Sequence, residues 1–377
     1  MFNPLPVRAG GLASRVVFSM HQFGRINRRM HNKLFIADNV FAVAGGRNIA
    51  DEYFGRGGPA NFIDMDILAS GPVVAELSSV FDRFWNSEHA YPVQSLLGRD
   101  MDAAAARSAF EQRLPPAESG AVVAALDVPG HEGIESQLAL GRIEQHFAQA
   151  RVLADAATKI DERRQDGDDA EVMGGVLGLL QAADSEVLLA SPYFVPGEHG
   201  LAVMSERVAR GVHIEVVTNS LATTDEPLVH FGYARSRGAL LKIGVALREL
   251  MPNAEPNPEN IPALSGSLGR LHAKLAIVDS RWLFIGSMNM DQRSSRTNTE
   301  VGLVIDSPEL AHEAAEILRH DRLPASYRLR LAEGGQRIEW VAGSEAAPTV
   351  LKREPGGATG PLFAQRLVSF MVGEEML

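Results

Sequence analysis

Two stretches of this chain repeat one pattern of apolar runs and polar turns. The paired apolar runs are 32–37 with 40–45 and 274–278 with 282–286. Asp38-Asn39 separates the first pair and Asp279-Ser280 the second, which predicts two β-hairpins. Each hairpin ends at glycine, and a proline then precedes apolar residues at helical spacing, at Pro72 and at Pro308. We therefore predict a hairpin followed by a helix, twice.

Strand and helix patterns alternate before the second hairpin, and this favours a mixed α/β lobe with some parallel pairing. Strands are predicted at 186–190, 213–218 and 244–248, helices at 201–210 and 228–242, a loop at 253–262, a loop-like stretch at 342–360 and a short amphipathic helix at 362–371. The Ala-rich and charged stretch before the second lobe reads as a connection of helix and loop. The predicted divisions are a first lobe 1–97, a connection 98–171, a second lobe 172–341 and a tail 342–377.

The hairpins carry a repeated motif, His-x-Lys-x4-Asp. The first copy is His31, Lys33 and Asp38, and the second is His272, Lys274 and Asp279. The match continues downstream: Gly45, Gly46 and Asn48 have the same offsets from the first His as Gly286, Ser287 and Asn289 from the second. Asp64 then lies eight residues before Pro72, as Glu300 does before Pro308. Two copies with matching downstream polar residues indicate an internal repeat that fixes both fold and chemistry.

The repeat is unequal at its start. About 85 residues of strand and helix precede the second motif, whereas only 30 precede the first. If the lobes are equivalent, the first lacks the counterpart of about residues 175–244. We expect upstream DNA in the same frame to encode a strand–helix–strand–helix stretch.

Composition narrows the function classes. The 377 residues are 45% hydrophobic and 22% charged, which is typical of a globular protein. Without cysteine, neither disulfides nor thiolate metal sites are available. No apolar run is long enough to span a bilayer, and the N-terminus is not a signal peptide. A net charge of −11 disfavours general nucleic-acid binding. The cluster Arg25, Arg28 and Arg29 fits either an anionic head-group contact or a solvated surface.

The doubled motif suits phosphoryl chemistry. Residues i and i+2 of a strand share a face, so each His points the same way as its Lys. Two lobes related by a pseudo-twofold axis would bring two imidazoles and two ammonium groups to one centre. The lysines, with Asn48 and Asn289, can hold phosphate oxygens. One His can attack phosphorus while the other, protonated, donates to the leaving oxygen. This requires opposed protonation states, and Asp64 and Glu300 are the candidates for orienting the rings.

Other residues leave alternatives open. Asp38 and Asp279 either fix the turn and the lysine or act directly in catalysis. Ser287 could donate to phosphate, but Gly46 replaces it in the first copy. His230 is the only other histidine that we single out, because it follows a polar loop. We expect neither a metal nor a cofactor, because lysines beside the histidines repel a metal ion.

These residues resemble the phospholipase D superfamily, whose signature is the doubled His-x-Lys-x4-Asp followed by Gly-Gly/Ser-x-Asn. The segments 30–33, 45–49, 53–55, 191–196, 218–225 and 298–300 are similar to bacterial cardiolipin synthases, nearest their C-type members. The resemblance implies an α/β fold of two repeated lobes, each a mixed β-sheet flanked by helices, with one active site at their interface. It implies a metal-independent transfer through a phosphohistidine, with His31 as the nucleophile and His272 as the acid.

The resemblance further implies cardiolipin synthesis from phosphatidylglycerol and a second phospholipid, with phosphatidylethanolamine as the donor in C-type relatives. We expect peripheral association with the bacterial inner membrane and no nucleic-acid partner. The alternatives are phospholipase D-type hydrolysis to phosphatidic acid, a nuclease of the same superfamily, and a catalytically silent membrane-binding fragment.

Overall fold

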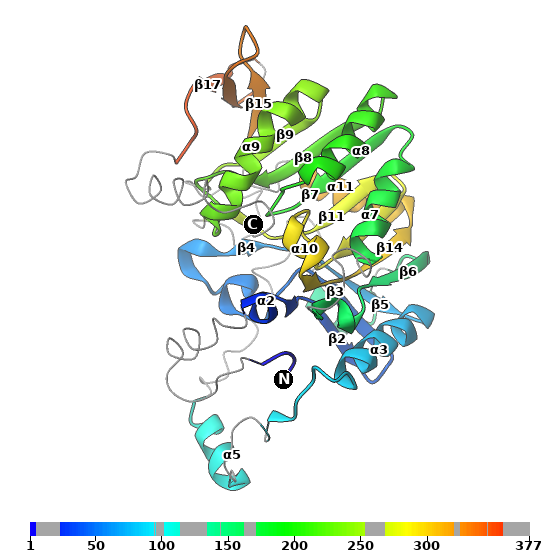
Figure 1. Ribbon diagram of the computed structural model, residues 1–377. Helices are drawn as coiled ribbons and strands as arrows, with labels where there is room; N and C mark the ends of the chain where they lie inside the picture. Colours follow the sequence, from blue (N-terminus) through cyan, green and yellow to red (C-terminus); the bar gives the residue numbers. More distant parts are fainter. Residues whose placement is uncertain are drawn as a thin grey trace.

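The computed structural model describes residues 1–4, 23–93, 95, 102–113, 134–143, 145–161, 171–252, 268–319, 325–344 and 346–356. The protein consists of two repeated α/β lobes. In Figure 1 the first lobe, in blue, lies below the larger second lobe, in green to yellow. The motif hairpins lie where the lobes meet, so the fold of each lobe is described only as far as it places those hairpins.

A ten-stranded mixed sheet forms the second lobe. Its order is β17 (Thr349–Leu351), β16 (Ile338–Ala342), β15 (Ser326–Leu331), β9 (Ala246–Leu250), β8 (His213–Asn219), β7 (Glu186–Ala190), β11 (Leu275–Val278), β12 (Trp282–Gly286), β14 (Val301–Asp306) and β6 (Gln149–Ala154). The three strands β7, β8 and β9 run parallel, and the other neighbours are antiparallel. β11 is apolar throughout and fully buried, which is typical of a strand covered on both faces.

Helices cover both faces of this sheet. α7 (Glu171–Gln181), α8 (Gly197–Ala209) and α9 (Pro227–Ile243) share one core with Val187 and Leu189 of β7. The alternate residues Leu188 and Ala190 belong to a second core, which includes α11 (Pro308–Arg319). Because successive strand residues point to opposite faces, the two cores lie on opposite sides of the sheet.

The first lobe is smaller. Its sheet has three strands in the order β2 (Leu34–Ala37), β3 (Phe41–Gly45) and β5 (Asp66–Ser70), followed by α3 (Pro72–Trp85). The apolar residues of α3 recur at helical spacing, and Val74 and Leu77 are buried in the same core as α11. The two lobes therefore share one apolar interface, and the pseudo-symmetric helices α3 and α11 both pack into it.

Two pairs of very short parallel strands cross between the lobes. β1 (Arg29–Met30) pairs with β13 (Asn298–Thr299), and β4 (Phe62–Ile63) pairs with β10 (Arg270–Leu271). Each pair joins the residues before one histidine to the residues before the other lobe's carboxylate. This reciprocal pairing is the tertiary expression of the sequence repeat.

Short helices complete the described chain. They are α2 (Phe23–Ile26), η2 (Asp51–Phe54), η3 (Gly58–Ala60), α5 (Ala103–Glu111), α6 (Ile134–Leu140), η5 (Ala157–Ile160) and α10 (Gln292–Arg296). α5 buries none of its residues and stands away from both lobes in Figure 1. By contrast, η2 and α10 follow the two motif hairpins and line the lobe interface.

Most predicted elements are present. Both hairpins form, both prolines begin helices, and the strand at 186–190 has the predicted bounds. Two expectations were wrong: β6 lies in the stretch expected to be helix and loop, and β17 lies in the loop-like tail. β6 gains its partner only from the distant strand β14, which no local pattern reveals, whereas β17 pairs with β16, the strand directly before it in the chain. The loop at 253–262 and the helix at 362–371 fall outside the described residues.

One face of the first sheet is exposed. Phe35, Val43 and Leu68 are cross-strand neighbours, and Phe35 is 66% exposed. The residues at the same repeat offsets in the second lobe, Ala276 and Phe284, are buried under its helical layer. Positions that are equivalent in the sequence repeat therefore have opposite environments.

Candidate active site

The crossed strand pairs set the two histidines opposite carboxylates of the other lobe. His31 follows β1 directly, and its backbone N–H donates to Thr299 O at 2.9 Å. His272 follows β10, and its N–H donates to Ile63 O at 2.7 Å. Because the pairing is parallel and in register, the next residues along the partner strands are Glu300 and Asp64. Each lobe thus supplies the carboxylate for the other lobe's imidazole.

Glu300 orients the ring of His31. Its carboxylate lies 2.9 Å from His31 Nδ1 and is fully buried. Ser287 Oγ and Ser294 Oγ donate to the same carboxylate at 2.6 and 2.8 Å. Burial alone would raise the pKa of Glu300, but His31, Lys33 and the serine hydroxyl hold that pKa below its usual range. Because an ionised carboxylate only accepts, Nδ1 carries the proton and Nε2 presents its lone pair.

Asp64 orients the ring of His272 in the same way. His272 Nδ1 lies 2.6 Å from Asp64 Oδ2. Burial acts to raise the pKa of Asp64, yet the hydrogen bond from His272 and the charge of Lys274 lower it overall. Burial, with Lys274 beside it, lowers the pKa of His272 to about 4.

The pKa of His31 is also lowered, chiefly by burial, although Glu300 opposes the shift. Both imidazoles are therefore neutral at neutral pH. The opposed protonation states expected from the sequence do not arise from the two carboxylates alone. An anionic phosphodiester between the rings would favour protonation of one of them.

The motif lysines complete a ring of four basic side chains. Lys33 Nζ donates to His31 O at 2.8 Å, and Lys274 Nζ donates to His272 O. Burial lowers the pKa of Lys33 to about 7 and that of Lys274 to about 8, while the site carboxylates act in the opposite direction. When they are protonated, ammonium groups enclosed in this way bind phosphate oxygens strongly.

The motif aspartates lie at the hairpin turns. Asp38 and Asp279 have φ of 52° and 53°, within left-handed two-residue turns. The Asp279 carboxylate accepts the backbone N–H groups of residues 184–186 and the hydroxyl of Ser185. These contacts tie the turn to the start of β7. Asp279 lies five residues after Lys274 in the sequence, at the far end of β11. Among the described contacts of Asp38 and Asp279, none reaches a motif histidine or lysine.

The polar residues after the hairpins serve different purposes in the two copies. Ser287 Oγ donates to Glu300 and accepts from Val301 N at 3.0 Å, so it supports the carboxylate. At Gly46 an added Cβ would overlap the shorter Asp64 carboxylate. Glycine beside Asp and serine beside Glu are thus matched choices, since the longer side chain leaves room for a hydroxyl.

The two asparagines also differ. Asn48 Nδ2 donates to Tyr53 OH at 2.8 Å, whereas Asn289 Oδ1 is buried and has no hydrogen-bond partner among the described residues. Tyr53 and Ser294 stand at the same offset in the two copies of the repeat, and both contact site groups. Because they are different residue types, comparing the two copies did not single them out. Asp155 likewise escaped the sequence analysis; it accepts from Glu300 N at 3.0 Å and from Lys159 Nζ at 2.7 Å.

His230 belongs to a different cluster. Its Nε2 lies 2.8 Å from Glu354 Oε1, which also accepts from Arg237 Nη2 at 2.6 Å. Burial would raise the pKa of Glu354, but these two neighbours lower it to about 2. The cluster fastens the tail to α9 and contains none of the motif residues.

Two arginines of the cluster before His31 pack against backbone. Arg25 Nη2 donates to Pro4 O at 3.2 Å, and Arg28 Nη1 donates to Lys159 O at 3.2 Å. Arg29 is exposed. At least two members of the basic cluster therefore help to hold the segment that leads into β1.

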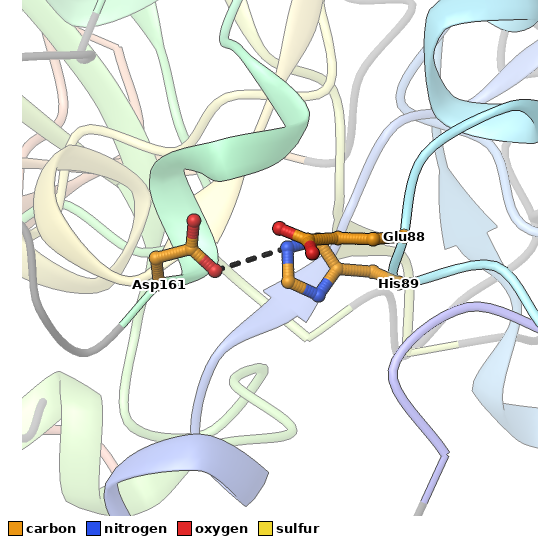
Figure 2. A group of neighbouring side chains, drawn as sticks. All are labelled: Glu88, His89 and Asp161. Carbon is orange, nitrogen blue, oxygen red and sulfur yellow. Dashed lines mark ion pairs between the residues drawn. The ribbon is translucent and has the colours of Figure 1, made fainter.

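One group among the described residues has metal-ligand chemistry. Glu88, His89 and Asp161 bring one ligand atom each within 4.8 Å of one another (Figure 2). His89 Nε2 and Asp161 Oδ1 already form an ion pair at 3.0 Å, and Glu88 is exposed. None of the three belongs to the repeated motif, and the phosphate chemistry of the site does not require them.

Comparisons with known proteins show what the chain is similar to. A family model described as "Cardiolipin synthase, PLD-like domain" matches residues 176–322. Cardiolipin synthase C of Escherichia coli K12 is 34% identical over 381 residues, covering 100% of this chain and 78% of that protein. Cardiolipin synthase A of Pseudomonas fluorescens SBW25 is 27% identical over 79% of this chain and 48% of its own length.

Among solved structures, phosphatidylserine synthase of Haemophilus influenzae Rd KW20 matches with a TM-score of 0.53 and 13% identity, covering 94% of this chain and 72% of that one. This likeness supports the two-lobed fold. In the described part of this chain no helix combines the length and apolar character needed to cross a bilayer.

Proposed function

Because the chain belongs to the cardiolipin synthase family of phospholipase D-like enzymes, we propose that it transfers a phosphatidyl group between phospholipids and makes cardiolipin. The acceptor in this proposal is phosphatidylglycerol, and the donor is a second phospholipid such as phosphatidylethanolamine. The observation that carries it is the crossed arrangement of two carboxylate-oriented imidazoles between two enclosed lysines.

His31 is the proposed nucleophile. Its side chain is 27% exposed, against 5% for His272, so it is the more accessible ring. With Nδ1–H held by Glu300, the Nε2 lone pair attacks phosphorus and forms a phosphohistidine. The bond from phosphorus to the donor's head-group oxygen breaks, and that oxygen takes a proton from His272. Lys33, Lys274 and the asparagines hold the non-bridging oxygens.

The second step reverses these roles. The acceptor hydroxyl of phosphatidylglycerol attacks the phosphohistidine, His272 takes its proton, and His31 Nε2 is released. His272 gave up its proton in the first step, so it is neutral and can take the proton of the acceptor hydroxyl. In the first step it must be protonated, and the charge of the bound phosphodiester supplies the required rise in its pKa. Water as the acceptor would give phosphatidic acid instead.

Peripheral attachment to the inner membrane is part of the proposal, because both substrates lie in bilayers. We place the site of action at the membrane surface. The acidic net charge gives no support for a nucleic-acid substrate.

The first test is lipid turnover by the purified chain. It is incubated with phosphatidylglycerol and phosphatidylethanolamine vesicles in the presence of a chelator, beside His31→Ala, His272→Ala and the exposed control His213→Ala, and the products are identified by mass spectrometry. Cardiolipin from the unmutated chain and the control alone supports transfer. Phosphatidic acid as the main product would make the enzyme a hydrolase.

A donor with a p-nitrophenol leaving group separates the two histidines. This leaving group needs no proton, so His272→Ala should still release p-nitrophenolate in a burst, whereas His31→Ala should not. A burst from His31→Ala and none from His272→Ala would reverse the proposed roles.

A further inference from the structure

Tyr53 is buried beside the acid–base histidine and is not part of the repeated motif. It lies on η2, and Gly55, with φ of 71°, closes that turn in a left-handed conformation. Tyr53 is 6% exposed, and its backbone carbonyl accepts from Arg47. Its ring stacks on Phe62 at 4.7 Å between centroids. The backbone and the ring are therefore both fixed, and the hydroxyl has a defined position.

That hydroxyl faces the reactive nitrogen of His272. Tyr53 OH lies 3.3 Å from His272 Nε2, and the two rings meet edge to face at 5.0 Å. Asn48 Nδ2 donates to the same hydroxyl at 2.8 Å. Since the Nδ1 proton of His272 points to Asp64, Nε2 is the acceptor, and the tyrosine proton is donated to it. Burial raises the pKa of Tyr53 to about 12, so the hydroxyl keeps this proton at neutral pH.

The second copy of the repeat has no equivalent. The residue at the same offset from Asn289 is Ser294, whose hydroxyl donates to the Glu300 carboxylate. Ser294 thus acts on the carboxylate behind the Nδ1 side of His31, while Tyr53 covers the Nε2 side of His272. This difference makes the two otherwise similar histidines chemically unequal.

We propose that Tyr53 is a positioning residue for His272: its hydroxyl holds Nε2 before substrate binds, favours the neutral imidazole, and yields that place to the substrate oxygen. The inference rests on the proposed function, in which His272 exchanges a proton with the leaving and attacking oxygens. A hydrogen bond donated to Nε2 stabilises the neutral ring and opposes its protonation. The Tyr53 and Phe62 rings both contact the His272 ring, at 5.0 and 5.3 Å between centroids.

The direct test is an NMR titration of the His272 ring in the full chain and in Tyr53→Phe. Phenylalanine keeps the stacking on Phe62 and removes only the hydroxyl. Loss of one neutral hydrogen bond should raise the titration midpoint of His272 by about 0.5 to 1 pH unit. Tyr327→Phe is the matched control, since Tyr327 is a buried tyrosine on β15 and should leave the midpoint unchanged. An unchanged midpoint in a folded Tyr53→Phe variant would overturn the proposal.

The kinetic test uses the pH dependence of lipid transfer, the reaction in which His272 exchanges a proton with the leaving and attacking oxygens. In Tyr53→Phe the pH limb that reports His272 should move upward by the same amount as the NMR midpoint, while in Tyr327→Phe it should not move. A limb that stays in place while the rate falls would overturn the positioning role and leave only a structural one. If the chain turns over no lipid, the proposed function fails, but the NMR titration still decides the contact between Tyr53 and His272.

Discussion

Replacing Glu300 with Gln tests the crossed carboxylate directly. The change is nearly isosteric, but Ser287 and Ser294 donate to different oxygens of Glu300, so the one amide oxygen accepts from only one of them. The new amide group faces His31 Nδ1 and cannot accept its proton. Instead the amide donates to Nδ1, which forces the ring proton to Nε2 and removes the lone pair needed for attack. Glu300→Gln therefore changes both the charge beside His31 and the tautomer of its ring.

The size of the effect follows from the contacts. The hydrogen bond of 2.9 Å between His31 Nδ1 and a buried carboxylate is charge-assisted, and such bonds contribute about 1.5 to 3 kcal/mol. At about 1.4 kcal/mol per tenfold this alone lowers kcat by roughly 10 to 150-fold, and the wrong tautomer deepens the loss toward about 10⁴-fold. Ser287→Ala, which keeps the charge, removes one neutral donor and should cost only about fivefold.

The assay is the burst of p-nitrophenolate across a pH series. Glu300 raises the pKa of His31, so its loss lowers that pKa further. Because the nucleophile must be neutral, the acid limb of the Glu300→Gln variant should move to lower pH. A burst rate within threefold of that of the unmutated chain, with an unmoved acid limb, would refute the reasoning that Glu300 orients the His31 ring and raises its pKa.

Three further predictions concern the packing and one buried ion pair. Gly46→Ala should displace the Asp64 carboxylate and reduce lipid turnover at least tenfold. Its control is Gly174→Ala, on an open helical face, which should keep activity and raise the free energy of unfolding by about 0.5 to 1 kcal/mol. Equal activities of the two variants would contradict the close contact between Gly46 and Asp64. Phe35→Ser, on the exposed face, should change the free energy of unfolding in urea by less than about 0.5 kcal/mol, and the repeat-equivalent Ala276→Ser should cost about 1 to 3 kcal/mol; similar costs would mean that both faces are covered. Glu354 contributes stability that is present above its unfolded pKa and lost as pH falls toward its folded pKa of about 2. The free energy of unfolding measured in urea should therefore fall by about 3 kcal/mol between roughly pH 5 and pH 2, and Glu354→Gln should flatten that part of the profile. The same pH dependence in Glu354→Gln would show that Glu354 is not its cause.

The two copies of the repeat differ in chemically coupled ways. Asp64 is one methylene shorter than Glu300, and Gly46 stands where the second copy has Ser287. Each pair fits only as a pair, because the short carboxylate needs the space of the missing side chain and the long one accepts the hydroxyl. The carboxylates are therefore best viewed together with the residues that follow the hairpins.

The sequence alone determined the repeat, both hairpins and the identities of the histidines and lysines. Short-range periodicity and turn chemistry suffice for these features, because a two-residue turn and a helix-starting proline act over a few residues. The same logic placed Asp38 and Asp279 at turns. It also singled out Asp64 and Glu300, since a repeated offset marks a position even without knowledge of its contacts.

Only the tertiary structure decided which groups meet. That Glu300 serves His31 and Asp64 serves His272 depends on parallel pairing between segments more than 200 residues apart, and no local pattern encodes that choice. The contact between Tyr53 and His272 also joins residues of different lobes that lie 219 positions apart in the sequence. The pKa values of the two histidines and two lysines also follow from enclosure between the lobes, because burial and neighbouring charge arise only when the chain has folded.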